Sequence, residues 1–217
     1  MNQLWKSNCK NIILSFVATT VAPVLFVLLM LFLGKFALVL PPFYIIAMII
    51  AGSLTWIGFV IWYIVSLMRF SKVQPTTLDN IYFEEVAASF ILVILSGVFG
   101  NVPFFTAFIQ LMASVILIRA IRSLLISPSY DMYCKKGFKY IYLAGVLRLV
   151  FAVVSMVTTI AYLFVSPSFI TSLLASKIAV VLLIIAGILL ISLLLMSLVF
   201  TFIGWMTIMK HAPEVEE

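Results

Sequence analysis

The sequence predicts an all-α fold in which six helices cross a lipid bilayer as three hairpins. Hydrophobic residues make up 65% of the 217 residues and charged residues only 9%, whereas a soluble domain has about 45–50% apolar and about 25% charged residues. Seven acids and thirteen bases are too few for the polar shell that a water-soluble core of this size needs. Lipid must therefore cover much of the surface, and we expect a single integral membrane domain.

Long runs without charge define the expected helices. They lie at residues 12–33, 43–68, 77–99, 102–125, 140–165 and 174–209. The first run is longer than the about 7–15 apolar residues of a cleavable signal and matches the about 20 residues of a spanning helix. The second run stops at Arg69 and Lys72, which suit the membrane surface.

The third helix is expected to start near Thr77. Pro75 prevents earlier helix continuation, and Thr76 with Asp79 has the spacing of a helix N-cap. The uncharged part of this helix, residues 86–99, is short for a full crossing. The third and fourth helices therefore either cross with acidic residues near the interface or form a re-entrant pair that does not cross.

Polar residues mark the fourth helix and the segment after it. Arg119 and Arg122 lie near its end, where their long stems can reach the headgroups. Gln110 is suited to a hydrogen bond with a neighbouring helix. Residues 123–139 combine bases with aromatic rings, which predicts a cytosolic loop at headgroup level.

The last apolar run is longer than one crossing requires. Residues 178–208 carry no charge, and as a helix they would span about 46 Å against a hydrocarbon core of about 30 Å. This helix must therefore tilt, kink or project from the membrane. Gly187 and Gly204 are its candidate points of flexibility.

Positive charge is concentrated on one side of the expected bundle. All thirteen Lys and Arg except Lys35 and Lys177 fall on the side that holds both termini. The positive-inside rule then places the N-terminus and the short acidic C-terminal tail in the cytosol, with the plasma or inner membrane as the expected location. Cys9 and Cys134 fall on this reducing side, where disulfides are disfavoured.

The same rule accounts for the net charge of +6. Nucleic acid is therefore not an expected partner, because the bases are scattered between apolar runs rather than gathered in one patch. The expected partners are the lipid bilayer, other membrane proteins and further copies of this chain.

Catalytic and metal-binding motifs are absent from the sequence. His211 is the single histidine, and no His or Cys spacing typical of a metal site occurs. A Gly-x-Ser-x-Gly elbow, a phosphate-binding Gly-rich loop and a His-Glu-x-x-His motif are also missing. We therefore expect a protein that is not an enzyme and that has no catalytic residue, cofactor or metal.

One charge lies well inside an expected helix. Arg148 is about eight residues into the fifth helix, and an ionisable residue within a membrane usually faces the protein interior and has a partner. Glu84 and Glu85 lie at a similar depth in the third helix, which predicts a polar cluster of Arg148 with Glu84 or Glu85 and with Arg119 nearby.

Two alternatives to a functional cluster stay open. In the first, Arg148 extends to the cytosolic headgroups, and the glutamates lie in water at a helix start, where acids are favoured. In the second, Arg148 and a glutamate form a purely structural ion pair.

Three functions are compatible with this sequence. Small size, short loops and missing chemistry favour a non-catalytic accessory, scaffold or assembly component of a membrane system. The polar cluster around Arg148 and the long last helix favour a small transporter or channel. An intramembrane enzyme acting on lipid would rest on Glu84 and Glu85 as acid and base, although adjacent helical residues point about 100° apart.

Overall fold

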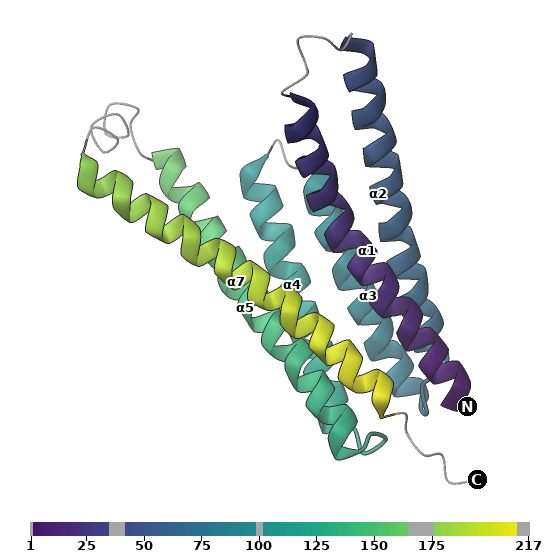
Figure 1. Cartoon of the computed structure of the whole chain (residues 1–217). Coiled ribbons are helices and arrows are strands. Elements are labelled where there is room, and N and C mark those ends of the chain that lie inside the picture. Colours follow the sequence, from purple (N-terminus) through teal and green to yellow (C-terminus); the bar gives the residue numbers. More distant parts are fainter. Residues whose placement is uncertain (1, 35–41, 99–101, 165–175, 212–217) are drawn as a thin grey trace.

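The computed structural model describes residues 2–34, 42–98, 102–164 and 176–211. Every regular element in these residues is a helix, so the predicted all-α fold is confirmed (Figure 1). The helices are α1 (Asn2–Gly34), α2 (Pro42–Ser71), α3 (Thr77–Val98), α4 (Pro103–Ile126), α5 (Met132–Phe164) and α7 (Lys177–Lys210). The loop at Lys35 and the acidic tail from residue 212 lie outside the described residues.

Five of these six helices are long and apolar enough to cross a membrane. The helix outside this group is α3, because Asp79, Glu84 and Glu85 all fall in its first half. Its 22 residues correspond to about 33 Å of helix, which matches a hydrocarbon core of about 30 Å. The chain is thus a multi-helix membrane protein, and the crossing by α3 stays a prediction.

Two helices begin earlier than the hydropathy pattern predicts. Helix α1 starts at Asn2 instead of residue 12, and α5 starts at Met132 instead of residue 140. The predicted loop at 123–139 is therefore wrong for most of its length. The uncharged run marks only the part of a helix in hydrocarbon, whereas these first turns bury Trp5 and Phe138 while their lysines lie at the surface.

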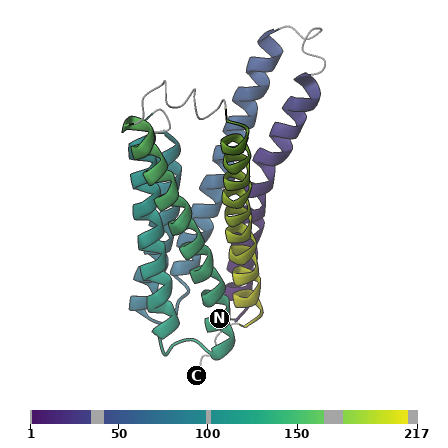
Figure 2. The same cartoon turned by 90° about the vertical axis from the view of Figure 1, so that its left-hand side faces the viewer.

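The six helices form a closed ring. Packing contacts join α1 to α2, α2 to α3, α3 to α4, α4 to α5, α5 to α7 and α7 back to α1. The three predicted hairpins are therefore present as adjacent pairs, and Figure 2 shows their helices running along one general direction. A ring of six helices leaves a central axis that side chains from every helix can reach.

Both ends of the described chain lie at the same end of the bundle, called here the terminal end (Figure 1). The indole Nε1 of Trp5 in α1 donates a hydrogen bond of 3.3 Å to the carbonyl oxygen of Ile208 in α7. On the neighbouring surface, the ring of His211 stacks on Tyr133 at 4.6 Å between centroids. These contacts hold the last turn of α7 against α1 and α5.

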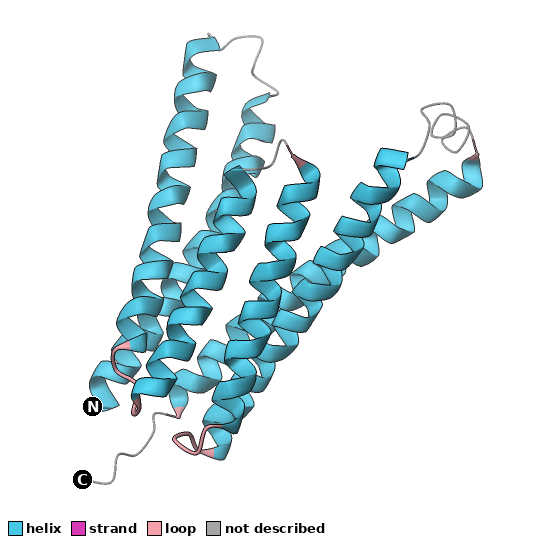
Figure 3. Ribbon diagram, turned by 180° about the vertical axis from the view of Figure 1, so that it is seen from behind, coloured by secondary structure: helices cyan, strands magenta, loops and turns pink. Residues whose placement is uncertain are grey.

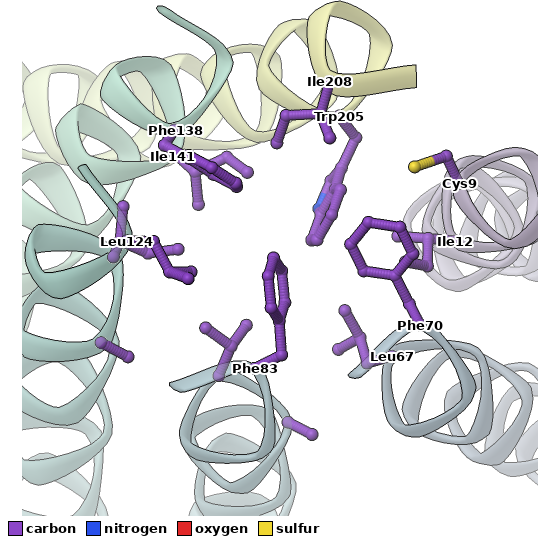
Figure 4. Close-up of a cluster of buried hydrophobic side chains, with 14 of the residues drawn as sticks. Cys9, Ile12, Leu67, Phe70, Phe83, Leu124, Phe138, Ile141, Trp205 and Ile208 are labelled. Carbon is purple, nitrogen blue, oxygen red and sulfur yellow. The ribbon is translucent and has the colours of Figure 1, made fainter. Parts of the chain in front are cut away.

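A layer of aromatic side chains fills the centre of the terminal end, as Figure 4 shows. Its members, called the aromatic layer, are Trp5, Phe70, Phe83, Phe138 and Trp205, each no more than 1% exposed. Ring centroids are 4.6 Å apart for Trp5 and Phe70, and 5.0 Å apart for Phe70 and Phe83, in tilted and edge-on geometry. This layer closes the bundle axis at the terminal end.

The loops at the terminal end are tied to the aromatic layer. The amide of Asp79 donates to the hydroxyl oxygen of Thr76 at 3.1 Å, which confirms the predicted N-cap of α3. Tyr130 donates its hydroxyl to Gln74 at 2.7 Å, and Gln74 in turn donates to the carbonyl oxygen of Phe70 at 2.6 Å. Burial raises the pKa of Tyr130, as does the neighbouring Asp79, so this hydroxyl remains a donor at neutral pH.

The opposite end of the bundle is splayed. Figures 1 and 3 show the α1–α2 pair and the α5–α7 pair diverging away from the terminal end. The side chains on the diverging part of α7 are largely exposed apolar residues, from Ile178 at 75% to Leu195 at 56%. Within a bilayer this surface faces lipid or another protein, not water.

Helices α5 and α7 cross at a pair of glycines. A Cβ atom on Gly204 would lie 2.9 Å from the carbonyl oxygen of Gly137, and one on Gly137 would lie 2.8 Å from that of Gly204. Small residues let two membrane helices approach at backbone distance. Gly204, predicted as a point of flexibility, is therefore a packing position, whereas a Cβ on Gly187 would meet nothing within 4 Å.

Candidate functional site: a cavity around Arg148

A cavity of about 270 Å³ lies on the bundle axis, farther from the terminal end than the aromatic layer. All six helices contribute to its walls. The lining residues are Phe16, Thr19, Thr20, Trp56, Val60, Tyr63, Phe90, Val93, Ile94, Gln110, Ser114, Arg148, Phe151, Leu194, Ser197 and Leu198. A larger depression of about 480 Å³ between α1 and α2 has no charged side chain, so the axial cavity is the better candidate site.

Arg148 supplies the single charge of this cavity. Because α5 begins at Met132 and ends at Phe164, Arg148 stands at its midpoint, with about 24 Å of helix on either side. Arg148 therefore lies farther from the start of its helix than the about eight residues that the hydropathy pattern predicts. A guanidinium at the middle of a spanning helix is expensive to bury and is held there only by specific contacts.

Two hydroxyl groups of α7 hold the guanidinium. Nε of Arg148 donates to Oγ of Ser197 at 2.9 Å, and Nη2 donates to Oγ1 of Thr201 at 3.3 Å. Both hydroxyls donate their own protons to backbone carbonyls, Ser197 to Ala144 and Thr201 to Ser197. Each oxygen is thereby oriented with a lone pair available for Arg148.

An aromatic ring completes this arrangement. The guanidinium carbon of Arg148 lies 5.2 Å from the ring centroid of Phe90 in α3, within the range of a cation–π contact. The side chain is therefore fixed inside the bundle. It does not extend to the headgroups, as one alternative from the sequence would require.

The predicted pairing of Arg148 with Glu84 or Glu85 does not occur. Instead, Arg119 of α4 lies 4.0 Å from Glu85 of α3, and Arg148 forms no ion pair within the part of the chain that the structure describes. The reason is the rotation of α5 in the ring, which turns Arg148 toward α7. Glu84 is exposed, and neither glutamate lines the cavity.

The Arg119–Glu85 pair lies on the surface. The side chain of Arg119 is 75% exposed, and Arg119 lines a shallow depression with Arg122. One oxygen of Glu85, Oε2, is buried without a hydrogen-bond partner among the described residues. Of the four residues that the sequence grouped, Arg119 and Glu85 form this interhelical pair, Arg148 lines the separate cavity, and Glu84 belongs to neither.

The remaining polar groups of the cavity are mostly occupied. Thr19, Thr20 and Ser114 donate to carbonyls of their own helices. The amide nitrogen of Gln110 in α4 lies 3.4 Å from the hydroxyl of Ser96 in α3, which confirms the predicted bridge between helices. The hydroxyl of Tyr63 is fully buried beside the indole of Trp205, and neither group makes a hydrogen bond of good geometry among the described residues.

The cavity thus has unused hydrogen-bond donors and no counter-ion for Arg148 among the residues that the structure describes. Arg148 has five N–H groups, of which two donate to α7. Three N–H groups of Arg148 therefore remain for a ligand. A buried cation is destabilised unless an opposite charge or several hydrogen bonds compensate it. The arrangement suits an anion.

Sequence reasoning missed Ser197, Thr201, Tyr63 and Phe90. A signal for the first two was present, since hydroxyl residues four apart lie on one face of a helix. Their partner could not be found this way, because nothing in the local sequence says which face of α7 meets Arg148.

The described residues hold no group of three or more His, Cys, Asp or Glu that could bind a metal ion. The fold and the cavity define a polytopic membrane protein with a cationic site on its axis. No protein-family model, curated protein or solved structure matches the chain.

Proposed function

We propose that this chain is a small membrane carrier that binds an anionic solute at Arg148. The observation that supports this function is a guanidinium that has no counter-ion among the described residues, in a cavity lined by all six helices. In membrane proteins, ionisable residues inside the bundle mark substrate or ion pathways. Of the two functions favoured by the sequence, the geometry supports the transporter.

A carrier fits this geometry better than an open channel. The aromatic layer closes the axis at the terminal end with rings that are at most 1% exposed, so no continuous water path runs along it. The splayed opposite end and the closed terminal end are unequal, as expected for one state of an alternating mechanism. Both termini are proposed to lie in the cytosol of a cell whose plasma or inner membrane holds the chain, because exposed lysines and arginines gather at the terminal end.

Thermal unfolding of the purified chain in detergent tests this function. A ligand at a hundred times its Kd stabilises the folded state by about 2.7 kcal/mol, a rise in Tm of about 5–10 °C for a chain of this size. The probes are chloride, phosphate, acetate and hexadecyl phosphate. We expect one of them to raise the Tm of the native chain and of Arg119→Gln, but not that of Arg148→Gln.

The control Arg119→Gln removes an exposed guanidinium outside the cavity. An anion that passes this test is then measured for uptake into proteoliposomes. If every probe shifts the Tm of the native chain and of Arg148→Gln equally, Arg148 is not a binding residue, and the proposal is wrong.

An assembly component is the second candidate. The first half of α7, from Ile178 to Leu195, is an exposed apolar surface that no other described helix covers. In this function a partner helix packs there. Extraction in mild detergent, followed by identification of copurifying proteins, tests it, and a monomer that copurifies with no defined partner would remove it.

A further inference from the structure

The walls of the Arg148 cavity indicate what kind of anion it binds, an inference that rests on the proposed function. We infer that the ligand is an amphiphile with one anionic head group and one hydrocarbon chain. Its head would contact Arg148, and its chain would lie along apolar walls toward the bilayer. Three observations lead to this inference.

The first observation is the distribution of polar groups in the cavity. Half of the sixteen lining side chains are purely hydrocarbon: Phe16, Val60, Phe90, Val93, Ile94, Phe151, Leu194 and Leu198. A small inorganic anion needs donors around it to replace its hydration shell. Here the unused donors lie together on Arg148, so they suit a head group with an apolar remainder.

The second observation is the route into the cavity. Three lining residues are substantially exposed, Trp56 at 37%, Val93 at 41% and Leu194 at 42%. In a bilayer, apolar side chains with this exposure contact lipid. Toward the terminal end, by contrast, the aromatic layer blocks the axis. A ligand thus reaches Arg148 more easily from the hydrocarbon than from water at that end.

The third observation is the cavity volume. At about 270 Å³ it is smaller than the about 300–1,000 Å³ of drug-sized sites. It can therefore hold a head group with part of a chain, while the rest of the chain extends outward. Helices α1 and α7 diverge away from the terminal end (Figure 1).

Equilibrium binding to the full chain in nanodiscs of neutral phosphatidylcholine tests the inference. The labelled probe is hexadecyl phosphate, which is mostly dianionic at pH 7.4 because the second phosphate pKa is about 6. Hexadecanol lacks the charge, and inorganic phosphate lacks the chain. We expect saturable binding of one hexadecyl phosphate per chain that an excess of neither competitor displaces.

Two kinds of variant locate the site. Arg148→Gln should weaken hexadecyl phosphate binding at least tenfold, while Arg119→Gln should leave it unchanged. Leu194→Trp fills the apolar wall without altering charge and should weaken binding by a similar factor. If Arg148→Gln does not fold, Leu194→Trp and Arg148→Lys give the answer, since Lys keeps the charge but loses the planar set of donors.

The outcomes separate the inference from the proposed function. If inorganic phosphate binds in an Arg148-dependent manner as tightly as hexadecyl phosphate, the cavity binds small anions, and only the amphiphile inference is wrong. If hexadecanol displaces the labelled probe as well as unlabelled hexadecyl phosphate does, the charge of the head group is irrelevant. The amphiphile inference and the proposed function are then both wrong. Binding of hexadecyl phosphate that is equal in the native chain and Arg148→Gln, with no binding of phosphate, also overturns both.

Discussion

At the residue scale, two buried tryptophans at the terminal end differ in the hydrogen bonds of their indole groups. Trp5 and Trp205 are each 1% exposed and both pack on Phe70. The indole of Trp5 donates to the carbonyl oxygen of Ile208, whereas that of Trp205 faces the Tyr63 hydroxyl without a hydrogen bond of good geometry among the described residues. A buried hydrogen bond contributes a net stabilisation of about 0.5–1.5 kcal/mol.

Trp5→Phe should therefore destabilise the protein more than Trp205→Phe does. Both changes remove a similar volume of ring from a packed layer, so the difference between them isolates the hydrogen bond. We expect that difference to be about 1 kcal/mol, measured by thermal unfolding in the same detergent. An equal or larger loss in Trp205→Phe would show that the bond between Trp5 and Ile208 does not stabilise the bundle.

At the same scale, the contacts of Arg148 depend on which helices pack against α5 and not on its depth in the sequence alone. Glu84 and Glu85 lie at a similar depth in their helix, so an ion pair with Arg148 was a reasonable prediction. Instead, two hydroxyl groups of α7 and the ring of Phe90 surround the guanidinium. These groups disperse the charge without neutralising it. The lack of a protein counter-ion within the described residues makes Arg148 available to a ligand.

At the scale of elements, the crossing of α5 and α7 depends on backbone contact. Each of the two glycines has the carbonyl oxygen of the other within 3 Å of the place that a Cβ atom would take. A methyl group cannot fit at that distance unless the helices separate. Separation would also move Ser197 and Thr201 relative to Arg148, since these residues join the same two helices.

Gly204→Ala should destabilise the protein by about 1–3 kcal/mol, the usual cost of overpacking a tight contact. Gly187→Ala is the matched control on the same helix, because a Cβ there meets nothing within 4 Å. The control should be neutral or slightly stabilising, since Ala favours helix more than Gly. Equal Tm values for the two variants would contradict the close crossing, and chemical denaturation in detergent provides a second measurement.

At the scale of the whole molecule, the ring supports the prediction that α3 crosses the membrane, which composition left open. This helix packs between α2 and α4, so it runs through the bundle with its neighbours. Its buried residues Phe83, Val86 and Ala87 face the other helices, and Glu84 is exposed near the terminal end. A re-entrant pair would not use the full length of α4, which is itself long and apolar enough to cross.

Reporter tags fused to the two ends of the chain should therefore lie on the same side of the membrane, and the distribution of bases predicts the cytosolic side. The measurement is protease accessibility of each tag in intact and permeabilised cells. A tag inserted in the loop between α1 and α2 is the control and should lie on the opposite side. Termini on opposite sides would mean an odd number of crossings and would contradict the six-helix ring in the membrane.

Much of the fold follows from the sequence by itself. Hydropathy depends on the composition of a single segment, so it indicates which segments enter the membrane. The distribution of Lys and Arg indicates which helix ends lie on the same side of the membrane. The N-cap at Thr76 and the bridge from Gln110 were likewise predictable, because a cap is local and an isolated amide in an apolar helix needs a partner. The starts of α1 and α5 were not, since a helix can continue beyond its apolar run.

The tertiary structure decided what meets on the bundle axis. Each helix can turn about its own axis without changing its hydropathy, and the joint packing of six helices selects one rotation for each. That selection turned Arg148 toward Ser197 and Thr201 and put Gly204 against Gly137. The cavity arises from the same selection, because its walls come from side chains of all six helices that only packing brings together.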